Sequence, residues 1–179
     1  HRHLLHCLRG WAILNQLNPH FINNALQWLQ VRLDNNDDEV GVGVIGKLSQ
    51  NIRSVFNYSR AKKAYHPLQE EIRLAENYLY VQKARFGDKL QYELPDENSL
   101  RPFENISIPL LMIQIHVENA VEHGIRNKAN GGFVKVRCTE EGDYINIEIE
   151  DDGVGRKVAG EIGSQGTGNG TKMLKEMET

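Results

Sequence analysis

The chain has 179 residues, of which 40% are apolar and 25% are charged, and its net charge is −3 at pH 7. This is the composition of an ordinary globular protein, and the length allows one large domain or two small ones. The charge gives no general electrostatic argument for binding nucleic acid, no apolar run reaches the roughly 18 residues of a membrane-spanning helix, and two cysteines make no disulfide framework. We therefore expect a reducing, cytosolic setting and no nucleic-acid partner.

Residues 1–87 are predicted to be helical. Apolar residues recur at spacings of three and four over 14–29 and again over 45–56, which is the pattern of amphipathic helices. The polar, acidic stretch Asp34–Gly43 contains glycines and is predicted to be the loop between these two helices. A lone helical hairpin buries little apolar surface, so we expect it to pair with a second copy into a four-helix bundle. A third helix is predicted after Pro67, in "LQEEIRLAENYLYVQKARFGD", with its end at Gly87.

A proline followed by a histidine interrupts the first helical pattern, in "LNPHFINN" (Leu17–Asn24). A proline inside a helix costs about 3 kcal/mol and removes a backbone hydrogen bond. In one interpretation Asn18 caps a helix that begins at Pro19, and His20 is an ordinary surface residue. In the other, Pro19 turns His20 outward as a nucleophile, and Asn24, four residues on, fixes which ring nitrogen reacts.

Residues 88–179 mix strands and helices, which predicts an α/β sandwich. "KLQYELP" alternates like a strand, and "PLLMIQIHVENAVEHGI" is predicted to be a helix with Pro109 at its start and Gly124 at its end. "FVKVRC" and "YINIEIED" are predicted to be two strands joined by a hairpin turn in "TEEGD". A Gly-rich stretch and a last helical piece, "TKMLKEME", complete the chain.

Two polar residues, Glu118 and Asn119, lie within an otherwise apolar helical pattern. They could be ordinary surface groups of that helix. Alternatively they serve a metal–nucleotide site, in which the Asn119 amide oxygen is a Mg²⁺ ligand and Glu118 orients a metal-bound water or acts as a base.

Two glycine-containing motifs come later in the chain. In "IEIEDDGVG" a strand runs into a turn, where an aspartate could accept a hydrogen bond from an exocyclic amine such as that of adenine. In "GTGNGTK" backbone N–H groups precede a helix and could hold an anion. Taken alone, the first could be an acidic turn and the second a flexible linker.

In this order, the three motifs resemble the ATP-binding domain shared by histidine kinases, gyrase-type ATPases and Hsp90, the GHKL (Bergerat) type. The resemblance implies that Asn119 binds Mg²⁺, that Asp151 binds adenine, and that ATP is the substrate. His123 matches a family position near the nucleotide. The implied nucleotide-binding residues are Asn119, His123, Asp151, Gly153 and Gly155 of the site and turn, and Gly166, Gly168 and Gly170 of a lid over the phosphates.

The segment "QLNPHFINNAL" resembles the phosphoacceptor segment of LytS/YehU-type sensor histidine kinases, and the likeness continues through most of the chain. It implies that His20 receives a phosphoryl group from Mg-ATP, with Asn24 and Glu118 in the reaction. It also implies a homodimer, a response-regulator receiver domain as partner, and a bacterial inner-membrane parent protein whose cytoplasmic part this is.

The expected fold class is therefore α+β, with a helical dimerisation and phosphotransfer region (1–87) before a GHKL-type ATP-binding domain (88–179). We expect the chain to be a fragment and this second domain to be truncated at its C-terminus. One alternative is a GHKL-type ATP hydrolase. Another is a degenerate kinase that acts as a dimerisation module, because Glu122 stands where many relatives carry Lys and the lid lacks a usual Leu.

Overall fold

The computed structural model describes residues 19–33, 38–61, 63–142 and 144–153. The chain divides into two compact units: unit 1 comprises the residues up to Gly87 together with Phe103–Met112, and unit 2 comprises Asp88–Pro102 together with the residues from Ile113 onward. Over the described residues the chain is α+β, as the sequence predicts. The dimeric bundle and the GHKL sandwich stay predictions. None of the helices in these ranges is long and apolar enough to cross a membrane.

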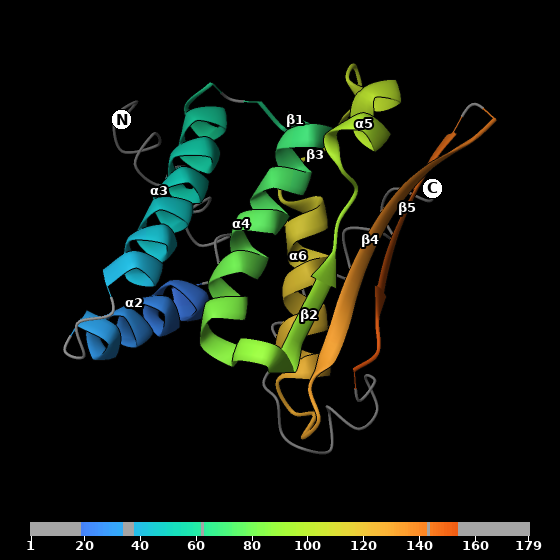
Figure 1. Ribbon diagram of the computed structural model, residues 1–179. Helices are drawn as coiled ribbons and strands as arrows, with labels where there is room; N and C mark the ends of the chain where they lie inside the picture. Colours follow the sequence, from blue (N-terminus) through green and yellow to red (C-terminus); the bar gives the residue numbers. More distant parts are fainter. Residues whose placement is uncertain (1–18, 34–37, 62, 143, 154–179) are drawn as a thin grey trace. The chain divides into compact units, whose positions relative to one another are not determined.

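Unit 1 is built mainly from helices (Figure 1). They are α2 (Pro19–Leu33), α3 (Asp38–Arg60) and α4 (Leu68–Phe86), and two short strands, β1 (Tyr65–Pro67) and β3 (Ser107–Pro109), pair antiparallel. Figure 1 shows α3 and α4 side by side and α2 at an angle to α3. The predicted helices on both sides of Pro67 are thus confirmed over the described residues.

The prediction of a loop over Asp34–Gly43 is wrong for its second half, because α3 already begins at Asp38. Two glycines near its start lie close to neighbouring helices. Gly41 is buried, and a Cβ added there would lie 3.7 Å from Leu29. A Cβ at Gly43 would lie only 2.6 Å from the hydroxyl oxygen of Tyr80. Close packing against neighbouring helices therefore outweighs the low helix propensity of glycine.

The face of α3 toward α4 is buried and includes two polar residues, Asn51 and Ser54. The Asn51 amide donates to the carbonyl of Leu74 over 3.0 Å, and its oxygen accepts from the Asn77 amide over 2.8 Å. Such paired amides fix the register of the two helices. Helix α4 ends as predicted at Gly87, which has φ +60° and donates its N–H to the carbonyl of Lys83.

A buried polar network holds the segment before α6 against the start of α4, within unit 1. His66 on β1 and Glu71 on α4 are both fully buried, and the His66 Nδ1 lies 2.8 Å from the Glu71 Oε1. The same carboxylate oxygen accepts the backbone N–H of Leu111 over 2.8 Å. Leu111 has φ +64°, a left-handed conformation that costs a non-glycine residue roughly 1–2 kcal/mol. One carboxylate thus holds a strained turn in place.

Unit 2 contains a three-stranded sheet in the order β2–β4–β5 (Figure 1). Strand β2 (Leu90–Glu93) runs parallel to β4 (Gly132–Glu141), which pairs antiparallel with β5 (Tyr144–Asp151). The strands predicted in these places are confirmed. The predicted turn is too long, because Thr139–Glu141 already belongs to β4 and Glu141 pairs with Tyr144. A short helix, α5 (Glu97–Leu100), comes between β2 and β3 in the chain.

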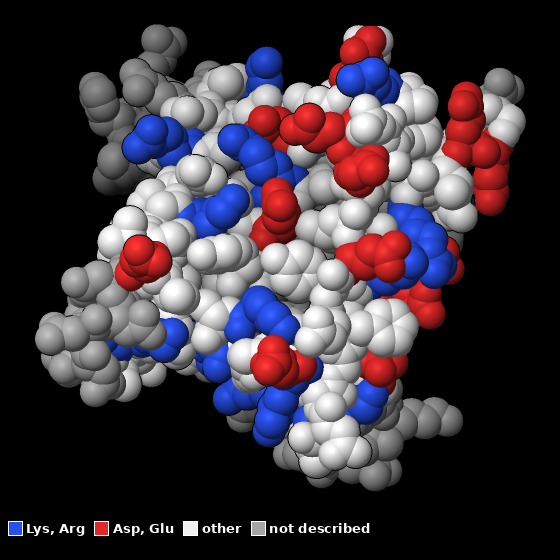
Figure 2. Space-filling model, in the orientation of Figure 1, with Lys and Arg blue, Asp and Glu red and all other residues white. Residues whose placement is uncertain are grey.

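The sheet of unit 2 has one buried and one charged face. Val134 and Val136 of β4 are buried on one side, as the alternation in the sequence predicts. On the other side, Lys135 pairs with Glu93 of β2 over 2.6 Å, and Arg137 pairs with two glutamates of β5. Figure 2 shows positive and negative side chains next to one another over this sheet, rather than a field of one sign.

The predicted helix over 109–125 differs from the structure in two places. Pro109 ends β3 instead of starting the helix, because its segment pairs with β1 and Leu110 donates its N–H to the carbonyl of Ala64. Helix α6 covers only Met112–Asn119, and a π-helical turn, Ala120–Ile125, comes after it. π-Helical turns are rare and occur frequently at functional sites.

Candidate nucleotide-binding site

The end of α6 carries the predicted acidic and amide groups in unit 2. Glu118 is 8% exposed, and its Oε1 accepts from the side-chain amide of Gln114 over 2.9 Å. Asn119 is half-buried at the last position of α6, and His123 is half-buried in the π-helical turn. This short segment therefore offers a carboxylate, an amide oxygen and an imidazole.

The predicted adenine-binding aspartate lies at the end of β5. Asp151 is exposed, and its Oδ1 accepts the backbone N–H of Gly153 over 2.9 Å. An aspartate that bonds its own backbone two residues on closes a tight local turn. The turn therefore holds the carboxylate in a defined orientation while leaving it open to solvent.

Two glycines bring the π-helical turn and the Asp151 turn into direct backbone contact. A Cβ at Gly153 would lie 2.6 Å from the carbonyl carbon of Gly124 and 2.7 Å from the Asp151 Oδ1. A Cβ at Gly124 would lie 2.8 Å from the same carboxylate oxygen. Since real Cβ atoms do not approach so closely, both positions need glycine. The structure thus joins Asp151 and Gly153 to the segment that begins with Asn119.

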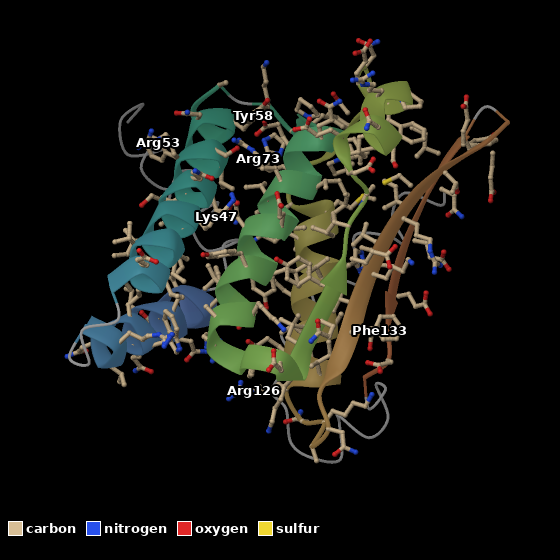
Figure 3. All side chains as sticks on the ribbon, viewed as in Figure 1. Lys47, Arg53, Tyr58, Arg73, Arg126 and Phe133 are labelled. Atoms are coloured by element: carbon tan, nitrogen blue, oxygen red, sulfur yellow. The ribbon has the colours of Figure 1, made fainter. Side chains whose placement is uncertain are left out.

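Three further residues hold this turn, and the sequence patterns did not identify them. The Asp152 carboxylate accepts the backbone N–H of Phe133 over 2.7 Å, and the Lys128 ammonium donates to its other oxygen over 2.8 Å. The hydrogen bond from Lys128 holds the pKa of Asp152 below its ordinary value. Figure 3 labels Phe133 at the start of β4. The second acid of "DDG" was the available signal, whereas nothing in the sequence marked Lys128.

The Glu122 carboxylate forms an ion pair with a nearby residue of the same segment. The Arg126 guanidinium, labelled in Figure 3, donates to its Oε2 over 2.9 Å, four residues further on. The Arg126 side chain is 46% exposed. A cation is therefore present on this segment although Glu122 itself is acidic.

The remaining predicted residues are placed only in part. His20 and Asn24 lie one helical turn apart on α2 in unit 1, and Asn24 is half-buried. The His20 side chain, and the lid and turn glycines Gly155, Gly166, Gly168 and Gly170, lie outside the described residues. Their predicted roles stay predictions.

Comparison with known proteins finds similarity to histidine kinases. A family model described as histidine kinase matches residues 11–90. The chain is 32% identical over 146 residues to the sensor histidine kinase YpdA of Escherichia coli. The matched region covers 80% of this chain and 24% of that protein. The chain is 30% identical over 142 residues to the sensor protein LytS of Staphylococcus epidermidis, covering 78% and 23%.

A third relative is the sensor histidine kinase BtsS of Escherichia coli, which is 33% identical over 138 residues and covers 76% of this chain and 23% of that protein. The chain thus spans about a quarter of the length of these relatives. The matched part includes both the proline–histidine segment of α2 and regions beyond α4. The chain is therefore similar to histidine kinases, and in particular to sensor kinases of the LytS type.

Proposed function

We propose that this chain is the kinase core of a two-component sensor, in which unit 2 binds Mg-ATP and His20 of unit 1 receives the γ-phosphoryl group. The observation that carries the proposal is the backbone contact between Gly124 and Gly153. It joins the Asp151 turn to the segment with Asn119 and His123, in a chain that is similar to histidine kinases. The phosphoryl group would then pass to an aspartate on the receiver domain of a response regulator.

In this account each group of unit 2 has one task. The exposed Asp151 carboxylate accepts a hydrogen bond from the adenine amine, and its turn presents it for that purpose. The Asn119 oxygen is one protein ligand for Mg²⁺, which takes its other ligands from phosphates and water. When bound, Mg²⁺ neutralises charge that develops on the phosphates. The described residues contain no cluster of three acidic, His or Cys side chains for a metal, so phosphate oxygens would supply most of its ligands.

The chemical step is a phosphoryl transfer to nitrogen. An unprotonated ring nitrogen of His20 would form the new bond to the γ-phosphorus while the bond to the bridging oxygen of ADP breaks. Before the transfer, the amide oxygen of Asn24, one turn after His20 on α2, would accept the N–H of the other ring nitrogen and so select the reactive one. This N–H becomes acidic when the first nitrogen bonds to phosphorus, and its proton would then pass to the Glu118 carboxylate.

The class of reaction can be tested with γ-labelled ATP and Mg²⁺ on the full-length protein. We expect a label on the protein that is labile in acid and stable in alkali, which is the behaviour of phosphohistidine. Steady release of ADP without a label would instead support an ATP hydrolase. Absence of both label and nucleotide binding would support a dimerisation module.

We also propose that the chain forms a homodimer through an exposed apolar stripe on α3. The stripe lies next to the buried face that contains Val44 and Leu48, and its residues are spaced three, seven and four apart: Val42, Ile45, Ile52 and Phe56, which are 67%, 46%, 38% and 49% exposed. Apolar residues at such spacings form the seam of paired helices. A second copy with the same stripe is the occupant that a self-complementary seam fits.

Replacement of Phe56 by glutamate should weaken this dimer. Burying a phenylalanine contributes about 1.5–3 kcal/mol, so we expect the dissociation constant to rise roughly 10- to 100-fold. Sedimentation of the full-length protein measures it. Tyr144, which is 80% exposed on β5, is the matched aromatic control, and Tyr144→Glu should leave the dimer unchanged. Equal effects of both variants would contradict the assignment of the stripe.

A further inference from the structure

Gln114 and Glu118 form a buried polar pair on α6, within unit 2. Gln114 is 1% exposed and Glu118 is 8% exposed, and the Gln114 Nε2 donates to the Glu118 Oε1 over 2.9 Å. Their neighbours on this helix, Ile113 and Val117, are fully buried and apolar. A leucine at position 114 would suit such surroundings better than an amide, because burying an amide costs free energy unless its groups are bonded. The hydrogen bonds of the amide must therefore account for its presence at this buried position.

The side-chain oxygen of Gln114, Oε1, is buried and forms no hydrogen bond with the described residues. The second fully buried glutamine, Gln82 on α4, differs in this respect: its Nε2 donates to the Tyr78 hydroxyl over 2.9 Å, and its Oε1 accepts from Arg85 over 2.8 Å. Gln82 is thus satisfied by its surroundings, whereas Gln114 directs its donor to Glu118 and leaves its acceptor unbonded.

An amide donor on one carboxylate oxygen restricts the rotation of the Glu118 carboxylate, which is otherwise broad about the last side-chain torsion. A restricted rotation suits a base that must be held in one orientation.

We propose that Gln114 is a positioning residue for the phosphoryl transfer, acting through Glu118. The proposal rests on the proposed function, in which Glu118 takes up the proton from the acceptor histidine. Gln114 touches neither nucleotide nor histidine in this account. Gln114 sets the orientation of the Glu118 carboxylate, which takes the proton from the histidine. A change at Gln114 should therefore alter the rate of phosphoryl transfer and leave the binding of ATP unchanged.

The test compares Gln114→Met with Gln82→Met in the full-length protein. Methionine keeps the length and unbranched shape of glutamine but has no N–H donor. We expect Gln114→Met to lower the rate constant for phosphohistidine formation about tenfold or more. The KM for ATP should stay within about twofold, because the proposal leaves binding untouched. Gln82→Met should change neither quantity, although it loses two hydrogen bonds and some stability.

A double-mutant cycle then separates positioning from general loss of structure. In a Glu118→Gln background there is no carboxylate to orient, so adding Gln114→Met should lower the rate no further. An unchanged rate in Gln114→Met, an equal loss in Gln82→Met, or additive losses with Glu118→Gln would each overturn the proposal. If the unaltered protein forms no phosphohistidine, the proposed function fails and the inference fails with it. An active unaltered protein with a fully active Gln114→Met variant would overturn the inference alone.

Discussion

Replacement of Gly153 by alanine is expected to weaken Mg-ADP binding by the full-length protein about 10- to 100-fold. The new Cβ would lie 2.6 Å from the Gly124 carbonyl carbon and 2.7 Å from the Asp151 Oδ1. The first of these atoms is backbone, so the turn has to move away from the π-helical segment. Inserting a methyl group into such a packed contact costs about 1–3 kcal/mol, and the displaced group is the proposed adenine acceptor. Calorimetric titration with Mg-ADP measures the effect.

Gly46→Ala is the matched control for this variant. Gly46 lies within α3, and nothing lies within 4 Å of a Cβ added there. Alanine favours helix over glycine by up to about 1 kcal/mol, so this variant should bind Mg-ADP normally and be slightly more stable. Normal Mg-ADP binding by a folded Gly153→Ala protein would contradict the placement of the nucleotide at this contact.

Replacement of Glu71 by leucine is expected to lower the free energy of unfolding by about 3 kcal/mol or more. The substitution removes one fully buried carboxylate that bonds both His66 and the N–H of Leu111. Each buried partner left unbonded costs about 1–3 kcal/mol. The left-handed Leu111 also loses the hydrogen bond that holds it. Urea denaturation followed by circular dichroism measures the change.

The neighbouring glutamate provides the comparison. Glu70 is part-exposed, and its carboxylate pairs with Arg73 on the surface of α4, labelled in Figure 3. Such surface pairs contribute about 0–1 kcal/mol, so Glu70→Leu should have a much smaller effect. Glu71→Gln keeps an oxygen that can accept from Leu111 and should fall between the two. Equal losses for Glu70→Leu and Glu71→Leu would show that burial of this network contributes little.

Apolar residues that recur at every second position, or at every third to fourth position, predicted most of the strands and helices. Apolar and polar residues alternate over most of β4 and β5, because one face of the sheet is buried and the other is charged. The end of α4 was predictable because Gly87 adopts a positive φ that other residues avoid. These features depend on local chemistry, and the sequence shows local chemistry directly.

Features that depend on distant partners were not predictable. The glycines of Asp38–Gly43 are typical of a loop, yet helix packing uses their small size. Pro109 is typical of a helix start, yet it ends a strand because its segment pairs with β1, which lies much earlier in the chain. The link from Lys128 to Asp152 joins positions 24 apart and leaves no periodic trace.

Some residues of the candidate site were also predictable from the sequence, whereas the contacts between them were not. The order of motifs named Asn119, Asp151 and Gly153 as candidate residues, and their roles in binding a nucleotide stay predictions. The contact of Gly124 with Gly153 appears only in three dimensions, because one residue lies in a helical segment and the other after a strand. The pairing of Asp152 with Lys128 also depends on the fold, because these residues are 24 positions apart in the chain. A sequence motif names the reacting groups, whereas the groups that orient them depend on the fold.

The most direct test of the account is the position of the phosphoryl group. The full-length protein, its His20→Gln variant and its His116→Gln variant are each incubated with γ-labelled ATP and Mg²⁺. His116 is a half-buried histidine of α6 with no role in the proposed reaction, so it controls for the loss of an imidazole. The account predicts an acid-labile label on the unaltered protein and on His116→Gln, and none on His20→Gln. An equal label on His20→Gln would contradict it, because the acceptor would then be another residue.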